Sequence, residues 1–164
     1  MKAKFNFNSQ ICTTREQAER LLALGLKKET ADCYYWQSTE PMYGEASGMW
    51  YLETLESKDS QEHFEYLDKN FGVCLADDEE HYFIPAWSLH RLWELLGKIK
   101  KYEGEDELLY PHIYLEEEDV IFISPKSIWA RRNFCSPKGV YENIINCLEE
   151  LIKEGYFNKE YWEE

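Results

Sequence analysis

Cys135 has the clearest chemical setting of any residue in this sequence. It closely follows Arg131 and Arg132, and a segment with the pattern of an amphipathic helix comes after it. Nearby positive charge and the N-terminal end of a helix both stabilise a thiolate, which is the reactive form of cysteine. A catalytic thiolate also needs a base, and the sequence does not place a histidine beside Cys135. A thiol-dependent hydrolase or transferase is therefore one alternative, and an inert packing cysteine is the more frequent case.

The same stretch is the basic segment of the chain. Residues 120 to 140 contain no acid and four bases, which are Lys126, Arg131, Arg132 and Lys138. Such a group is suited to hold an anion at a helix N-terminus, or to dock against carboxylates of this chain or of a second copy. Pairing with the chain's own surface acids is the simpler alternative, and it contributes little stability. The four bases are binding candidates.

Neither the histidines nor the acidic runs predict a metal site. No two of the four histidines stand three or four residues apart, and there is no Cys-x-x-Cys or His-Glu-x-x-His motif. The acidic runs at residues 77 to 80 and 116 to 119 lack the alternating ligands and central glycine of a calcium loop. We interpret both runs as solvated turns, and we predict no metal and no other cofactor.

Charge and aromatic content limit the class of protein. The 164 residues include 32 acids against 18 lysines and arginines, a net charge of −14, together with 6 Trp, 12 Tyr and 8 Phe. High acidity alone is typical of disorder, but the aromatic residues supply the apolar area for a core. The acids are concentrated in residues 53 to 80, 101 to 119 and 141 to 164. Such a surface repels nucleic acid and favours a basic protein partner.

The sequence predicts neither export nor membrane insertion. Its first eight residues contain two lysines and no apolar run of signal-peptide length, and nowhere do about 18 apolar residues stand together. An odd number of scattered cysteines is typical of reduced thiols rather than of a disulfide framework. We therefore expect a cytoplasmic protein with reduced cysteines. These are Cys12, Cys33, Cys74, Cys135 and Cys147.

Local patterns in the first half predict helices around a strand pair. Thr13 and Glu16 match a capping box, and Gly25 with Leu26 matches a Schellman stop, so we expect a helix over residues 14 to 24. The segments 33–36 and 49–55 are rich in Tyr and Trp and predict a hairpin with a long loop. A helix over residues 60 to 70 and two short strands within residues 73 to 84 are expected next.

Tyr43 lies in the middle of the long loop of this hairpin. Aromatic residues inside strands are explained by core packing, whereas an aromatic residue in a loop is more easily explained by contact with a partner. We therefore interpret Tyr43 as a binding candidate.

The second half has a further set of element signals. Pro85 is suited to the first turn of a helix that runs to residue 96, and residues 112 to 123 predict a hairpin across four acids. The tripeptide Ser-Pro-Lys begins at Ser124 and again at Ser136, and each copy predicts a helix start. Strand pairs between helices predict an α+β fold with helices packed on a mainly antiparallel sheet, as a single domain over residues 1 to 164.

The helix after Ser136 has the strongest amphipathic pattern in the chain, and Gly155 is expected to end it. Its apolar side contains Val140, Tyr141, Ile144, Ile145, Leu148, Leu151 and Ile152. Its predicted solvent side contains Glu142, Asn143, Asn146, Glu149, Glu150 and Lys153.

Three segments of the sequence stand out together. They are the Pro-Ala-Trp-Ser-Leu run from Pro85, the capped segment from Cys12 to Leu26, and the final helix ending in Lys-Glu-Gly-Tyr-Phe. These segments resemble a family of small bacterial proteins of prophages and other mobile elements. The resemblance leaves residues 37 to 80 unmatched. It implies a shared fold, and the family has no established activity to transfer.

These observations favour a non-enzymatic, acidic protein-interaction module of the cytoplasm, encoded on a prophage or similar element, that engages a basic protein. One alternative is a DNA mimic, in which rows of carboxylates imitate phosphates and block a DNA-binding protein. The other is the thiol-dependent enzyme with Cys135 as its nucleophile. We expect no direct contact with nucleic acid or membrane.

Overall fold

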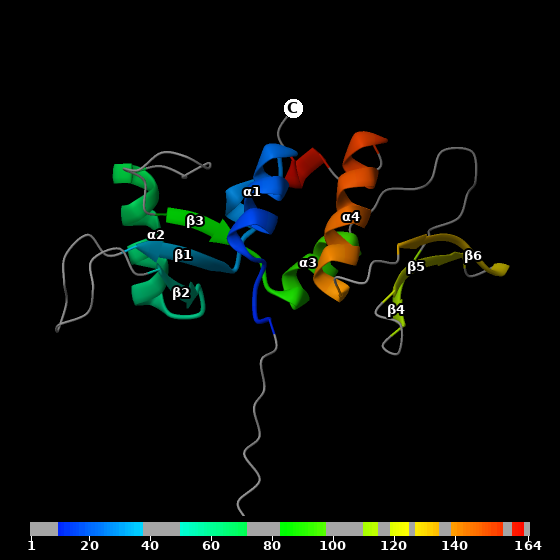
Figure 1. Ribbon diagram of the computed structural model, residues 1–164. Helices are drawn as coiled ribbons and strands as arrows, with labels where there is room; N and C mark the ends of the chain where they lie inside the picture. The colour runs from blue at the N-terminus through cyan, green and yellow to red at the C-terminus, as the bar shows by residue number, and fades with distance from the viewer. Residues whose placement is uncertain are drawn as a thin grey trace, which may run out of the picture.

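The computed structural model describes residues 10–37, 50–71, 83–97, 110–114, 119–124, 127–134, 139–155 and 159–162. Figure 1 shows strands β1 to β3 with α2 at one end, α1, α3 and α4 in the middle, and strands β4 to β6 at the other end. Their bounds are α1 (Arg15–Ala23), η1 (Lys28–Thr30), β1 (Cys33–Gln37), β2 (Trp50–Thr54), α2 (Lys58–Phe71), β3 (Phe83–Ala86), α3 (Leu89–Leu96), β4 (Tyr110–Tyr114), β5 (Asp119–Ser124), β6 (Ser127–Phe134), α4 (Val140–Lys153) and η2 (Lys159–Tyr161). The fold is α+β, as predicted.

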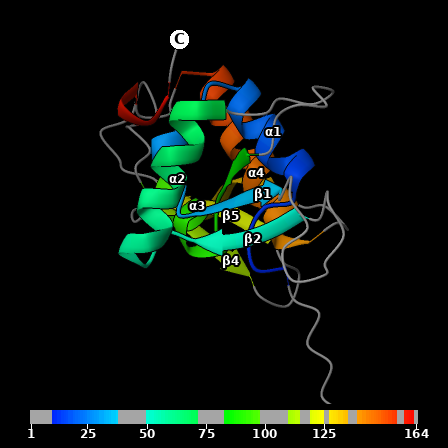
Figure 2. The ribbon, with the colours of Figure 1, turned by 90° about the vertical axis from the view of Figure 1, so that its left-hand side faces the viewer.

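The first sheet has the strand order β2-β1-β3, and both strand pairs are antiparallel. Gln37 pairs with Trp50 at the loop end of the hairpin, which confirms the predicted aromatic strands. Successive residues of a strand face opposite sides, and the sheet uses both sides. Tyr34 packs edge-on against Phe64 of α2, whereas Tyr35 contacts the core beside α1. Figure 2 shows α2 lying across one face of β1 and β2.

Pro85 lies inside β3 rather than at the start of a helix, so the predicted helix start is wrong. The residue pairs with Tyr34 of the central strand, and β3 is an edge strand in which a missing N–H is tolerated. The chain then stays extended because Trp87 pairs with Thr13 through two hydrogen bonds of 2.8 and 3.1 Å. Helix α3 begins only after Ser88, whose Oγ accepts the amide of Arg91 at 3.1 Å.

The first helix is confirmed, with its cap one residue later than predicted. Thr14 and Gln17 form the capping box, because Thr13 is buried and occupied by the pairing with Trp87. The predicted stop is also confirmed. The amide of Leu26 donates to the carbonyl of Leu21 at 3.0 Å, and Gly25 has a φ of 89°.

Helix α2 is confirmed and slightly longer than predicted, since it starts at Lys58. Ser57 caps it, accepting the Ser60 amide at 3.0 Å. Of the strands expected within residues 73 to 84, only the end of that segment is described, as the start of β3. The acidic run at residues 77 to 80 lies outside the described residues.

The second sheet has the order β4-β5-β6 and is antiparallel. The predicted hairpin is confirmed, with Tyr114 opposite Asp119 at its closed end. The helix predicted from Ser124 is wrong, because residues 127 to 134 form β6 and pair with β5. Ser124 is the last residue of β5, and Pro125 and Lys126 lie outside the described residues. In a sequence, proline and serine favour a turn as much as a helix start.

Helix α4 begins at Val140 with Gly139 as its cap, which corrects the predicted start at Ser136. Gly139 has a φ of 95°, a conformation that glycine adopts without steric cost. The predicted apolar side is buried apart from a half-buried Val140, and Gly155 follows the helix end with a φ of 77°. Glu142 and Asn143 are buried rather than exposed, and Glu142 is covered by Gln17 and Arg20 of α1.

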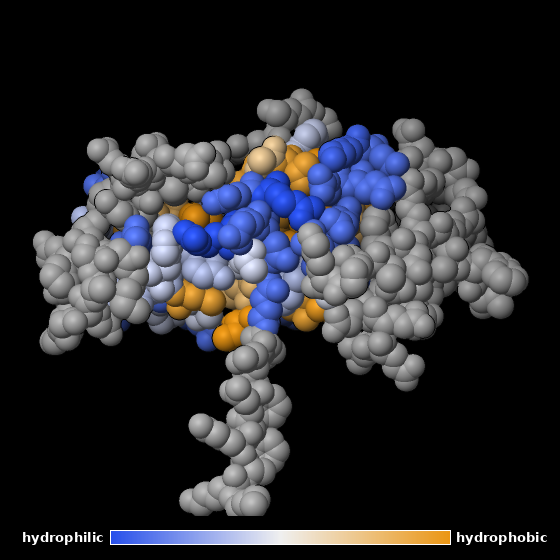
Figure 3. All heavy atoms as spheres, viewed as in Figure 1, coloured by the Kyte–Doolittle hydropathy of each residue, from blue (hydrophilic) through white to orange (hydrophobic). Residues whose placement is uncertain are grey.

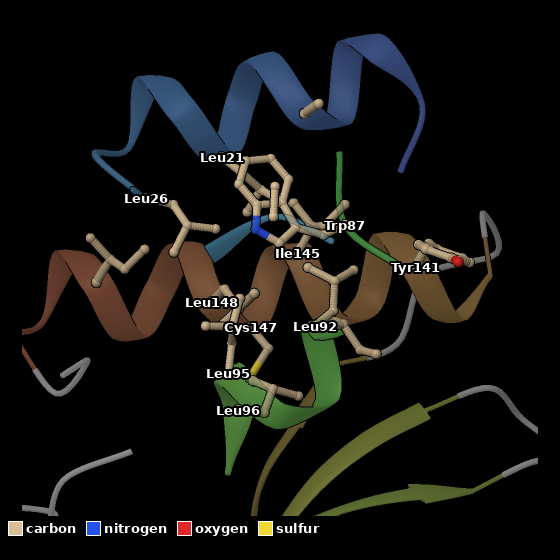
Figure 4. Packing of buried hydrophobic residues seen from close by; sticks show 14 of the residues in the cluster. Leu21, Leu26, Trp87, Leu92, Leu95, Leu96, Tyr141, Ile145, Cys147 and Leu148 are labelled. Carbon is tan, nitrogen blue, oxygen red and sulfur yellow. The ribbon is translucent and has the colours of Figure 1, made fainter. Parts of the chain in front are cut away.

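The core lies between α1, α3 and α4. Figure 4 shows Trp87 between α1 and α4, with leucines of α3 packed against the far side of α4. Trp87 is fully buried, and its indole N–H donates to Thr30 Oγ1 at 2.9 Å. Helix α4 also lies against β5 and β6. It therefore connects the two sheets through one apolar helix layer.

Candidate interaction surface

Helix α2 is held on the first sheet by a half-buried polar network. The Tyr34 hydroxyl donates to Glu53 Oε2 at 2.6 Å and lies 2.9 Å from His63 Nδ1. Because the phenol proton goes to the carboxylate, the phenol oxygen accepts from His63 Nδ1–H. Burial, and then the bond to Glu53, raises the pKa of Tyr34 well above its usual value. The network fixes which side of α2 turns toward β2.

Aromatic side chains enclose this network. Trp36 donates its indole N–H to Glu53 Oε1 at 3.0 Å, and its ring stacks on Tyr51 at 4.8 Å. The His63 ring stands edge-on to Trp36 at 5.0 Å. Both Glu53 oxygens therefore accept a hydrogen bond from a neutral donor, and His63 Nδ1 lies 3.8 Å from Oε2.

Acids without a cationic partner lie on α2 and in the turn that precedes it. Among the described residues, Glu56, Asp59 and Glu65 have no cationic partner, while Glu62 pairs with Lys58 at 3.1 Å. Uncompensated carboxylates attract a basic partner more strongly than paired ones do. We call these three residues the α2 acidic group.

One stripe of α2 faces the same way as His63. Residues 59, 63, 66 and 70 recur at helical spacing, which puts Asp59 and Tyr66 on the side of the helix that is turned toward β2. Tyr66 is 57% exposed. An exposed tyrosine beside uncompensated acid is the composition that protein interfaces favour.

Two acids of α4, Glu142 and Glu149, are by contrast paired with cations. Arg20 contacts Glu142 at 2.6 Å and both Asn146 and Glu149 at 2.9 Å, and Lys153 contacts Glu149 at 2.8 Å. Lys153 and then Arg20 hold the pKa of Glu149 below its usual value. Figure 3 shows hydrophilic side chains gathered over α1 and the adjoining part of α4. Much of this hydrophilic surface is therefore internally neutralised.

A cavity of about 440 Å³ lies between β1, the end of β2 and the start of α3. Its lining includes Asp32, Ser88, Arg91 and the exposed Ile11. Asp32 accepts both the amide and the hydroxyl of Ser88, at 2.8 and 2.5 Å, while that hydroxyl also caps α3. Ser88 and Asp32 thus anchor a helix start, which is a structural rather than a nucleophilic arrangement.

The structure describes only two of the predicted site residues. Arg131 and Arg132 are consecutive residues of β6, and α4 packs against this strand. Tyr43, Lys126, Cys135 and Lys138 lie outside the described residues. The anion site at the N-terminus of the last helix therefore stays a prediction.

The prediction of reduced cysteines is wrong for one pair. Cys12 and Cys33 form a disulfide, and Cys147 is buried in the core. Both disulfide partners are almost fully buried beside Ala86. Spacing along the chain did not indicate this pair, because 21 residues separate them and the sheet brings them together.

The described part of the chain contains no group of three His, Cys, Asp or Glu side chains arranged to hold a metal ion. None of its helices has the length and apolar run that a bilayer crossing requires.

Comparisons with family models, with curated proteins and with solved structures found no match to this chain. The resemblance to prophage proteins therefore stays a prediction.

Sequence reasoning missed the network of Tyr34, Glu53 and His63. One signal was available in the sequence. Glu53 occupies the strand side shared with Tyr51 in an aromatic segment, and a carboxylate at such a position needs a donor. Its partners were not predictable, since they lie 19 residues earlier and 10 residues later in the chain.

Proposed function

We propose that this protein is a non-enzymatic interaction module that binds a basic protein through the exposed side of α2. The observation that supports this proposal best is the α2 acidic group, Glu56, Asp59 and Glu65, which has no cationic partner among the described residues. The net charge of −14 adds long-range attraction for a basic partner. The exposed ring of Tyr66 supplies an aromatic anchor beside the acids.

A protein partner is better supported than DNA mimicry. A DNA mimic needs continuous rows of carboxylates that are available to a DNA-binding protein. On α4, Glu142 and Glu149 are paired with Arg20, which removes them from such a row. The thiol-enzyme alternative depends on Cys135, which lies outside the described residues, and it stays a prediction.

We also propose that the protein acts in the cytoplasm and is encoded on a prophage or similar element. Fractionation of host cells tests the location, and we expect the chain in the cytoplasmic fraction. Recovery from the periplasm or the medium, where a disulfide such as Cys12–Cys33 persists, would contradict a cytoplasmic location.

Matched charge variants test the proposed site. One variant, Glu56→Gln with Asp59→Asn and Glu65→Gln, neutralises the α2 acidic group. The control neutralises three exposed acids elsewhere and changes the net charge equally; its substitutions are Glu29→Gln, Glu154→Gln and Glu160→Gln. Both variants and the wild type are used for affinity capture from lysate of the host at low and moderate salt.

We expect the wild type and the control to recover the same basic protein, and the α2 variant to lose it. Three exposed ion pairs at about 0.5 kcal/mol each amount to about a tenfold change in Kd. Remote charges are screened over about 8 Å at physiological salt, so the control should change Kd less. Equal losses in both variants would contradict a site on α2, and no recovered partner at low salt would contradict the function.

A further inference from the structure

The two edges of the first sheet differ in how they are protected. On the β3 edge, Pro85 lacks an N–H, and Thr13 pairs with Trp87 just beyond the strand. The β2 edge, Trp50–Thr54, contains no proline, lysine or bulge, and no described residue pairs with its outer side. An unprotected edge is a template on which another strand can form hydrogen bonds.

One hydrogen bond between β2 and β1 determines which backbone groups of β2 point outward. The amide of Leu55 donates to the carbonyl of Asp32 at 2.9 Å, so this pair exchanges bonds between β2 and β1. Bonded and non-bonded pairs alternate along an antiparallel ladder. The N–H and C=O groups of Trp50, Leu52 and Thr54 therefore point away from β1, toward the edge on which no described residue pairs.

The side chains at this edge have opposite characters on the two faces of the sheet. On the α2 face, the edge carries the Glu53 carboxylate, and Asp59 belongs to the stripe of α2 that contains His63. On the other face, Leu52 is an apolar residue that is 37% exposed, while Trp50 is covered by Arg15 at 4.7 Å. A strand added here would meet acid on one side and an apolar residue on the other.

We propose that the basic partner binds by adding one extended segment to β2 as a fourth, antiparallel strand of the sheet. This inference rests on the proposed function and specifies its binding mode. Side chains that lie directly opposite each other share a face, so the segment places apolar residues opposite Leu52 and basic residues opposite Tyr51 and Glu53. Its sequence therefore alternates basic and apolar residues.

Charge complementarity favours this occupant over a second copy of the chain. Two copies paired edge to edge would bring together two molecules with a net charge of −14 each and two copies of the acidic side of β2. A basic segment meets the same edge with opposite charge. The free edge and the acid beside it thus select the same partner.

Backbone-methylated peptides test the strand pairing without altering the protein. The probe is a capped heptapeptide of four lysines alternating with three valines, measured by calorimetry or fluorescence anisotropy at low ionic strength. In one analogue the valine amides are N-methylated, and in the other the internal lysine amides are. Both analogues keep the charge and side chains of the parent peptide.

We expect the valine-methylated peptide to bind about tenfold more weakly or worse, because the valine amides face β2, and the lysine-methylated peptide to bind within about threefold of the parent. The protein variant Leu52→Pro removes one outward N–H while the bonds of Tyr51 and Glu53 to β1 remain, as Pro85 does on the other edge. It should weaken the parent peptide similarly, with its thermal unfolding measured alongside.

Each other outcome overturns the proposal. Equal binding of both methylated peptides would show attraction by charge alone, which leaves the proposed function intact and removes the strand pairing. Failure of the parent peptide to bind at low salt would contradict the basic partner class itself. A wild-type dimer that Leu52→Pro dissociates would assign the edge to a second copy.

Discussion

The phenol of Tyr141 joins three separate segments, so its removal tests the packing of the helix layer. The hydroxyl accepts the amide of Leu89 at 3.0 Å and donates to the carbonyl of Ile11 at 2.5 Å. Tyr141 is 5% exposed, and its ring belongs to the core cluster of α4. Tyr141→Phe keeps the ring and leaves a helix-start amide and a carbonyl without this partner.

A buried backbone group that loses its hydrogen bond costs about 1–3 kcal/mol. Partial hydration of Ile11, which is an exposed residue, reduces the carbonyl's share, so we expect Tyr141→Phe to lower the free energy of unfolding by about 2 kcal/mol. Urea unfolding followed by tryptophan fluorescence should show a midpoint lower by about 1 M with an unchanged slope. The control Tyr66→Phe, at an exposed ring, should stay within about 0.5 kcal/mol of wild type.

The same residue predicts how stability falls at high pH. Burial raises the pKa of Tyr141 to about 12, against about 10 in the unfolded chain. Between these values the folded state keeps a proton that the unfolded state has lost. Stability is therefore complete below pH 10 and falls by about 1.4 kcal/mol per pH unit up to about pH 12.

Wild type and Tyr141→Phe should consequently approach each other in stability above pH 10, because the phenylalanine variant lacks this contribution. The other tyrosines titrate in both proteins, so the difference isolates Tyr141. A Tyr141→Phe variant as stable as wild type at pH 7, or a difference that does not change with pH, would refute the reasoning.

Two further perturbations test other contacts. Arg20→Gln should lower the free energy of unfolding by about 2 kcal/mol in urea titrations, because it removes the cation that Arg20 supplies to a largely buried Glu142. The control Lys58→Gln, at an exposed pair, should change that free energy by less than about 0.5 kcal/mol. Oxidised wild type should exceed the Cys12→Ala, Cys33→Ala variant by about 3 kcal/mol, and a reductant should remove that excess in calorimetry. An unchanged Arg20 variant, or no effect of reductant, would contradict these contacts.

Signals confined to a few neighbouring residues predicted the fold well. The stop at Gly25 and Leu26 depends on hydrogen bonds within one helix turn, and the sequence indicated it correctly. The apolar side of α4 was also correct, because its spacing alone determines which residues share a face. Where local chemistry has one stable outcome, sequence is enough.

Where a local sequence pattern is compatible with two structures, contacts with distant residues determine which structure forms. Pro85 is compatible with a helix start or an edge strand, and pairing with β1 selects the strand. Thr13 is a good helix cap, but Trp87, 74 residues away, takes its hydroxyl. Glu142 has the pattern of a solvent residue, and Arg20, 122 residues away, buries it. Local patterns carry no information on such partners.

The most direct test of a binding surface on α2 and β2 is a titration of isotope-labelled wild type, followed by NMR, with the heptapeptide of alternating lysine and valine. We predict that the largest amide shift changes fall on β2, above all on Leu52 and Thr54, and on the α2 stripe that contains Asp59 and Tyr66. Changes centred on α1 and α4, or no changes at low salt, would contradict the account.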